Sequence, residues 1–132
     1  MALLETALWV VLAIVVIVVC LFAWSVYNGL IRKKNRVINA LAQIDVQLKR
    51  RTDLIPNLVS SVKGYMKHER GVLTELTKAR TSIMKAKSLE KKAKASNQIT
   101  GALKSIFAVA ENYPKLRANE NFLHLQEELS GT

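Results

Sequence analysis

An uncharged apolar run near the N-terminus constrains this chain more than any other feature. No charged residue occurs from Thr6 to Ile31, and residues 8–24 are almost entirely aliphatic or aromatic. A helix of roughly 20 such residues crosses the hydrocarbon core of a bilayer. Trp9 lies near one end of the run and Trp24 and Tyr27 near the other, which suits the two interfacial aromatic belts. We therefore predict a transmembrane anchor over residues 6–31.

A cleaved signal peptide is the alternative interpretation of this run. Signal peptides carry a basic n-region and an apolar stretch of roughly 7–15 residues. Here no basic residue precedes the run and the run is longer, although Ala23-Trp24-Ser25 resembles a cleavage site. A lipoprotein site at Cys20 is disfavoured because bulky Val19 precedes it. An uncleaved anchor is the favoured interpretation.

The charge distribution predicts the orientation of the anchor. Glu5 is the only charged residue before Arg32, so the net charge of +10 divides into −1 before Arg32 and +11 from there on. A juxtamembrane cluster at residues 32–36 contains Arg32, Lys33, Lys34 and Arg36. The positive-inside rule places that cluster in the cytoplasm. We expect a single-pass cell-membrane protein with residues 1–5 outside, residues 32–132 in the cytoplasm, and the cluster on anionic headgroups.

A heptad pattern follows the basic cluster. Apolar residues recur at alternating steps of three and four from Leu41, with Arg51 and Glu69 as exceptions. This spacing predicts a long helix over residues 37–87 that packs against a partner helix. We refer to its main apolar positions as the seam: Leu41, Ile44, Leu48, Ile55, Leu58, Val62, Tyr65, Val72, Leu76 and Ile83.

Pro56 interrupts the predicted helix. Proline costs ~3 kcal/mol in a helix interior because it lacks an N–H and its ring clashes with the preceding turn. Either one helix is kinked there, or a second helix begins with Thr52 or Asp53 as its N-cap. The seam keeps its register across Pro56, which favours a kinked, nearly continuous helix.

The remaining sequence predicts two shorter helices. Five lysines and one glutamate fall within residues 85–94, so residues 88–96 are expected to form a basic linker. Helical patterns then cover residues 97–111 and 119–129, with Asn119 as a candidate N-cap. No alternating strand pattern is present. The predicted fold is all-α: the anchor, the long heptad helix, and two short helices that pack back on it as a helical hairpin or bundle.

The lengths of these helices predict self-association. The two short helices together cover about half of the long one, and exposed apolar surface costs ~25 cal/mol per Å². The uncovered part of the seam should therefore contact a second copy of this chain or another membrane protein.

The sequence offers no catalytic, cofactor or metal site. It has no phosphate-binding glycine motif, its two histidines, His68 and His124, are far apart, and its lone cysteine lies in the apolar run. Nucleic-acid binding is disfavoured because the basic residues form separate clusters without interleaved aromatics. We predict a protein that is not an enzyme, has no cofactor and binds no nucleic acid.

Two long runs resemble the LemA family. One contains Asn35-Arg36-Val37 and the segment 42–59, with Asp53-Leu54-Ile55-Pro56-Asn57 at its centre. The other covers 108–122, with Glu111-Asn112-Tyr113-Pro114, and continues through 125–129. The resemblance implies a bacterial single-pass protein with a cytoplasmic helical domain, no catalytic residues and, from magnetosome-associated relatives, a part in membrane organisation.

The resemblance departs from the family pattern at Ser130-Gly131-Thr132, where family members usually continue into a long final helix. The chain is then a naturally short member, a processed form, or part of a longer product. Three functions remain open: a self-assembling scaffold or adaptor, an accessory subunit of another membrane protein such as a protease or envelope-stress component, and a membrane-surface remodeller driven by basic residues.

Overall fold

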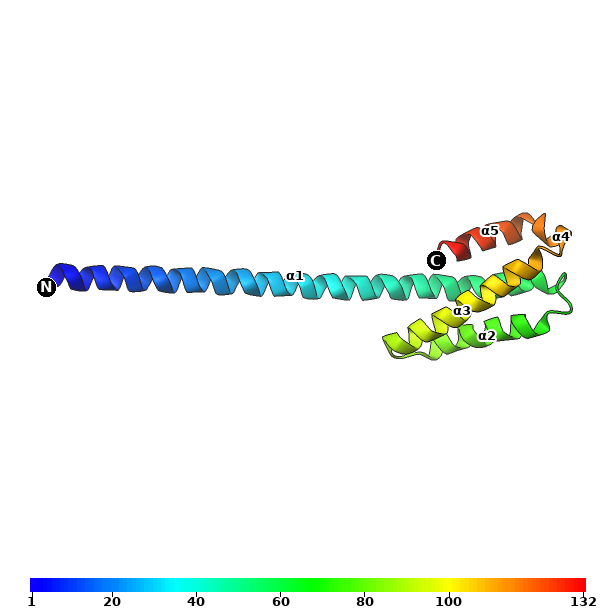
Figure 1. Ribbon diagram of the computed structural model, residues 1–132, viewed down its shortest axis with the longest axis horizontal. Coiled ribbons are helices and arrows are strands. Elements are labelled where there is room, and N and C mark those ends of the chain that lie inside the picture. The colour runs from blue at the N-terminus through cyan, green and yellow to red at the C-terminus, as the bar shows by residue number, and fades with distance from the viewer. The chain divides into compact units, whose positions relative to one another are not determined.

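Helices make up all the regular structure of this chain (Figure 1). The computed structural model describes residues 1–132. The elements are α1 (Ala2–Lys63), α2 (Arg70–Lys85), α3 (Leu89–Ala110), α4 (Pro114–Arg117) and α5 (Glu120–Ser130). The predicted all-α class is confirmed. The chain divides into two compact units, Met1–Gln43 and Ile44–Thr132.

The first unit consists of the N-terminal part of α1. An 18-residue window of this helix has a mean hydropathy of 3.0, and none of that window is buried against other parts of the chain. By length and composition α1 can cross a membrane. The long apolar helix predicted at the N-terminus is therefore present.

The second unit is a helical bundle with one apolar core. α2 and α3 lie side by side, and the end of α1 shares their apolar core. Hydrogen bonds from Arg50 to Glu128 and from Asn121 to Ser61 join α1 and α5. Phe107 of α3 contacts Phe122 of α5 edge to face, with ring centroids 6.2 Å apart. The buried apolar residues that form the core are Ile55, Leu58, Val62, Met66, Leu73, Leu76, Ala79, Ile83, Ala95, Ile99, Ala102, Leu103, Ile106, Ala110, Leu116, Phe122, Leu125 and Leu129.

The prediction of a single helix over residues 37–87 is wrong. α1 ends at Lys63, and a turn over residues 64–69 reverses the chain into α2. Gly64 begins this turn, and glycine is about 1 kcal/mol less favourable than alanine in a helix. The reversal brings Val62 and Leu76 into the same core, so the chain gains more apolar burial than an extended helix would allow.

The predicted basic linker over residues 88–96 is also wrong. α3 begins at Leu89, and the Ser88 hydroxyl caps it by accepting a hydrogen bond of 3.3 Å from the Lys91 amide. The lysines of this segment therefore lie on a helix, and α3 is longer than the predicted helix over residues 97–111.

The C-terminal part of the bundle agrees more closely with the prediction from the sequence. α5 begins after Asn119, whose side-chain oxygen accepts a hydrogen bond of 3.1 Å from the Phe122 amide, and it ends at Ser130, before Gly131. The short α4, with Pro114 in its first turn, was not predicted.

α1 continues through Pro56 without a break. The alternative in which a new helix begins at Thr52 or Asp53 is therefore excluded. Thr52 is the one buried polar residue of the chain, and its hydroxyl donates a hydrogen bond of 2.8 Å to the Lys49 carbonyl within α1.

Candidate functional site

Most of the seam is covered within the chain itself. Ile55, Leu58, Val62, Leu76 and Ile83 are buried in the bundle core, and Leu48 and Val72 are half-buried against it. The helices after Lys63 cover more of the seam than the expected half, because the turn after Lys63 folds the seam's two halves against each other. These residues stabilise the bundle, and the five buried ones leave no surface for a second chain.

The first two seam residues remain uncovered, together with two apolar residues just before them. Leu41 is 40% exposed and Ile44 42%, and the preceding Val37 and Ile38 are 59% and 50% exposed. These four residues recur along one face of α1 at helical spacing, and we call them the apolar stripe. Tyr65, in the turn after α1, is the other exposed member of the predicted seam.

The two polar interruptions of the heptad have specific partners. Arg51 Nη1 donates a hydrogen bond of 3.2 Å to Ser96 Oγ of α3, and burial lowers the pKa of the Arg51 guanidinium. The Tyr113 hydroxyl lies 2.9 Å from both carboxylate oxygens of Glu69 and donates its proton between them. That hydrogen bond, together with desolvation and the Glu69 charge, raises the pKa of Tyr113. Both positions thus tie α1 or its turn to later parts of the bundle.

The residues predicted to meet the membrane are exposed on α1. Trp9, Trp24 and Tyr27 project from the apolar part of the helix. Arg32, Lys33, Lys34 and Arg36 follow it, and none of them forms an ion pair. An exposed apolar segment followed by unpaired basic residues is the arrangement that an anchor and its headgroup contacts require. The orientation of the anchor stays a prediction.

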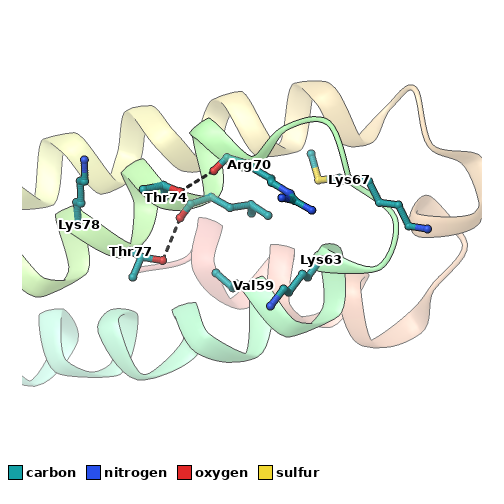
Figure 2. A pocket seen from close by; sticks show the side chains of 9 residues that line it. Val59, Lys63, Lys67, Arg70, Thr74, Thr77 and Lys78 are labelled. Carbon is teal, nitrogen blue, oxygen red and sulfur yellow. Dashed lines mark hydrogen bonds between the residues drawn. The ribbon is translucent and has the colours of Figure 1, made fainter.

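A groove of about 870 Å³ lies between the end of α1 and α2 (Figure 2). Four basic side chains line it: Lys63 from α1, Lys67 from the turn, and Arg70 and Lys78 from α2. Its apolar lining comes from Val59, Met66 and Leu73. We call this site the basic groove. Sequence reasoning missed it because its residues converge only through the unpredicted turn at residues 64–69.

Local hydrogen bonds order the α2 wall of the basic groove. The Thr74 hydroxyl donates to the Arg70 carbonyl at 2.8 Å, and the Thr77 hydroxyl donates to the Leu73 carbonyl at 3.0 Å (Figure 2). Both hydroxyl protons are used within the helix, so the donors that the groove offers to a ligand are chiefly its ammonium and guanidinium groups.

No three His, Cys, Asp or Glu side chains of this chain converge at a distance suited to a metal ion. His68 lies in the turn and His124 on α5, where its Nδ1 is 3.9 Å from Glu128.

Comparison with known proteins places the bundle in a family. The sequence model of the LemA family matches residues 40–132. A curated relative, Protein LemA of Metamycoplasma hominis, is 31% identical over 108 residues, which cover 78% of this chain and 48% of the relative. The chain belongs to the LemA family. Neither the family description nor the relative's name specifies a reaction.

The LemA match covers the bundle, the basic groove and the last two residues of the apolar stripe, Leu41 and Ile44. The apolar part of α1 lies before the matched region. The chain spans about half the length of the curated LemA relative.

Proposed function

We propose that this LemA-family chain is a non-enzymatic, membrane-anchored scaffold or adaptor that self-associates through the apolar stripe. The observation that supports this function is the exposure of Val37, Ile38, Leu41 and Ile44 in a chain whose bundle buries most of the remaining seam. Contact between copies would remove this apolar surface from water at a gain of ~25 cal/mol per Å².

A second copy of the chain is the natural occupant of the stripe. Copies inserted with one orientation stand parallel in the bilayer, which aligns equal heights of α1 and raises their effective concentration. Within the stripe, Leu41 occupies the first core position of the heptad, and Val37 and Ile44 the second. Leucine at the first position with isoleucine at the second favours three or four strands over two in parallel coiled coils.

The basic residues next to the anchor support its placement on a bilayer. Arg32, Lys33, Lys34 and Arg36 each contribute ~1 kcal/mol when they lie near anionic headgroups. With the positive side in the cytoplasm, the bundle faces the cell interior and the N-terminus faces outward. The scaffold would thereby gather copies of the bundle at the inner leaflet and contribute to membrane organisation.

Cysteine cross-linking in membranes tests this proposal. In a Cys20→Ser background, Leu41→Cys and Ile44→Cys are expected to form disulfide-linked adducts between copies on mild oxidation. Val46→Cys is the matched control, since Val46 is 65% exposed on the same helix but lies outside the stripe. Equal cross-linking at all three positions would contradict the proposal. Adducts with a different protein in native membranes, and none between purified copies, would instead support an accessory subunit.

A further inference from the structure

The four cations of the basic groove have no anionic partner in this chain. Lys63, Lys67, Arg70 and Lys78 form no ion pair, and no carboxylate lines the groove. Three other cations of the bundle pair with carboxylates: Lys49 with Asp53, Arg50 with Glu128 and Lys92 with Asp45. The groove therefore concentrates positive charge that the rest of the fold leaves uncompensated.

The local structure makes this charge unfavourable without a ligand. Lys63 and Lys67 are four residues apart, and Arg70 is three residues further on. Arg70 also begins α2, where the helix dipole is positive; the N-cap residue Glu69 forms no side-chain cap, and its carboxylate instead accepts a hydrogen bond from the Tyr113 hydroxyl. Like charges near a positive helix end repel one another, so an anionic ligand would relieve the repulsion among all of these groups at once.

The shape and lining of the groove indicate what kind of anion fits. Met66 and Leu73 are buried beneath the groove, so the apolar surface open to a ligand comes chiefly from half-buried Val59 and from the aliphatic stems of the lysines (Figure 2). A single inorganic anion would use neither the apolar lining nor the volume of about 870 Å³. An amphipathic helix uses both, because its apolar face enters a groove while its polar face meets the rim.

We propose that the basic groove binds an acidic amphipathic helix of a partner protein. Leucine-like side chains of that helix contact Val59 and the aliphatic stems of the lysines, and its glutamates or aspartates pair with Lys63, Lys67, Arg70 and Lys78. This contact is separate from self-association, since the apolar stripe and the groove share no residue. A scaffold that assembles through the stripe would thus present one such groove on every copy.

The test uses the full chain in non-ionic detergent micelles and a fluorescent peptide of about 15 residues, long enough for appreciable helicity. One face of the peptide carries leucine and the other glutamate, and a second peptide has glutamine in place of every glutamate. We expect the glutamate peptide to bind, and its affinity to fall as salt rises. The glutamine peptide should bind at least about tenfold more weakly, because charge complementarity is lost.

Two double variants locate the binding. Lys67→Gln with Arg70→Gln should weaken binding of the glutamate peptide about tenfold. Lys94→Gln with Lys104→Gln removes the same charge from exposed positions of α3 and should leave the affinity within about twofold. Circular dichroism spectra should be unchanged in both, because all four residues are exposed, and the melting temperature should not fall in either variant, since the groove variant removes charges that repel one another.

Several outcomes would overturn the proposal. Equal losses of peptide affinity in the two double variants would show a nonspecific charge effect. Equal affinity for the glutamate and glutamine peptides would show that the partner needs no acidic residues. Displacement of the peptide by inorganic phosphate at low concentration would identify a simple anion as the ligand. Loss of binding to vesicles of anionic lipid in the Lys67→Gln, Arg70→Gln variant, with peptide binding intact, would identify the groove as a lipid site.

Discussion

Arg80 of α2 donates a hydrogen bond of 2.9 Å from its Nε to the backbone carbonyl of Thr52 in α1. That carbonyl lies four residues before Pro56, which has no N–H to donate to it. The guanidinium therefore replaces the helical hydrogen bond that proline removes, in the middle of the bundle and next to buried Thr52. A contact between two helices thus helps α1 to remain helical through a proline.

Replacing Arg80 with alanine should destabilise the bundle by about 1–3 kcal/mol, because it leaves the Thr52 carbonyl without a donor. Pro56→Ala restores the intrahelical N–H, so the same Arg80→Ala change should cost less in that background. Chemical unfolding, followed by circular dichroism, is measured for the natural sequence, Arg80→Ala, Pro56→Ala and the double variant. The difference between the two costs of Arg80→Ala is the coupling free energy between Arg80 and Pro56. Lys85→Ala, an exposed cation of α2, is the control and should have a small effect. Equal costs of Arg80→Ala in both backgrounds would show that the two residues act independently.

The Tyr113–Glu69 contact should make stability fall at high pH. Because the pKa of Tyr113 is raised in the folded chain, the unfolded chain ionises first, near the ordinary value of 10.0. The contribution of the contact is complete below that pH and is lost as pH rises through the folded-state pKa. Melting temperatures should show Tyr113→Phe as less stable than the natural sequence at neutral pH, and the difference should shrink above pH 10.0.

A spectrophotometric titration gives an independent measurement of the same contact. Glu69→Gln removes the charge that Tyr113 faces, so the phenol should then ionise at a lower pH than in the natural sequence. A tyrosine titration curve unchanged by Glu69→Gln would contradict the contact.

The two parts of the seam should respond differently to truncation. Leu58 is fully buried, and Leu58→Ala should lower the free energy of unfolding by about 2–5 kcal/mol. Leu41→Ala removes a side chain that is 40% exposed and should leave the unfolding of the bundle nearly unchanged while weakening association. Chemical unfolding and cross-linking, measured on both variants, separate the effects. A large loss of bundle stability in Leu41→Ala would contradict the division of the seam.

The orientation of the anchor can be tested by labelling from outside the cell. In the Cys20→Ser background, a membrane-impermeant maleimide should label Ala2→Cys in intact spheroplasts and label Ser130→Cys only after lysis. Neutralising Arg32, Lys33, Lys34 and Arg36 with glutamine should reduce the outside labelling of Ala2→Cys, because the charge bias that orients the anchor is lost. Labelling of Ser130→Cys in intact spheroplasts would reverse the predicted topology.

Local signals in the sequence predicted the parts of the fold that depend on local chemistry. The apolar run before Arg32 and the Asn119 cap of α5 need no knowledge of the rest of the chain. The turn at residues 64–69 could not be found in this way, because Val72 and Leu76 continue the heptad after it. Gly64 and Gly71 flank this turn in the sequence. The low helix propensity of glycine, however, does not distinguish a weakened helix from a reversal of the chain.

Because the turn at residues 64–69 was not predicted, the basic groove was not predicted either. Lys63 and Lys78 are 15 residues apart, which one continuous helix would separate by about 22 Å. Only the reversal after Lys63 puts them in one groove. It also buries Ile55 and Leu76 together, which reduces the surface available for self-association to the apolar stripe.

The size of the particle extracted in mild non-ionic detergent tests the central claim most directly. Light scattering combined with size-exclusion chromatography should show an assembly of three or four copies for the natural sequence. The double variant Leu41→Asp, Ile44→Asp should be monomeric, and the control Val46→Asp should keep the assembly. A monomeric natural sequence at every concentration, or an assembly unchanged in the double variant, would contradict self-association through the apolar stripe.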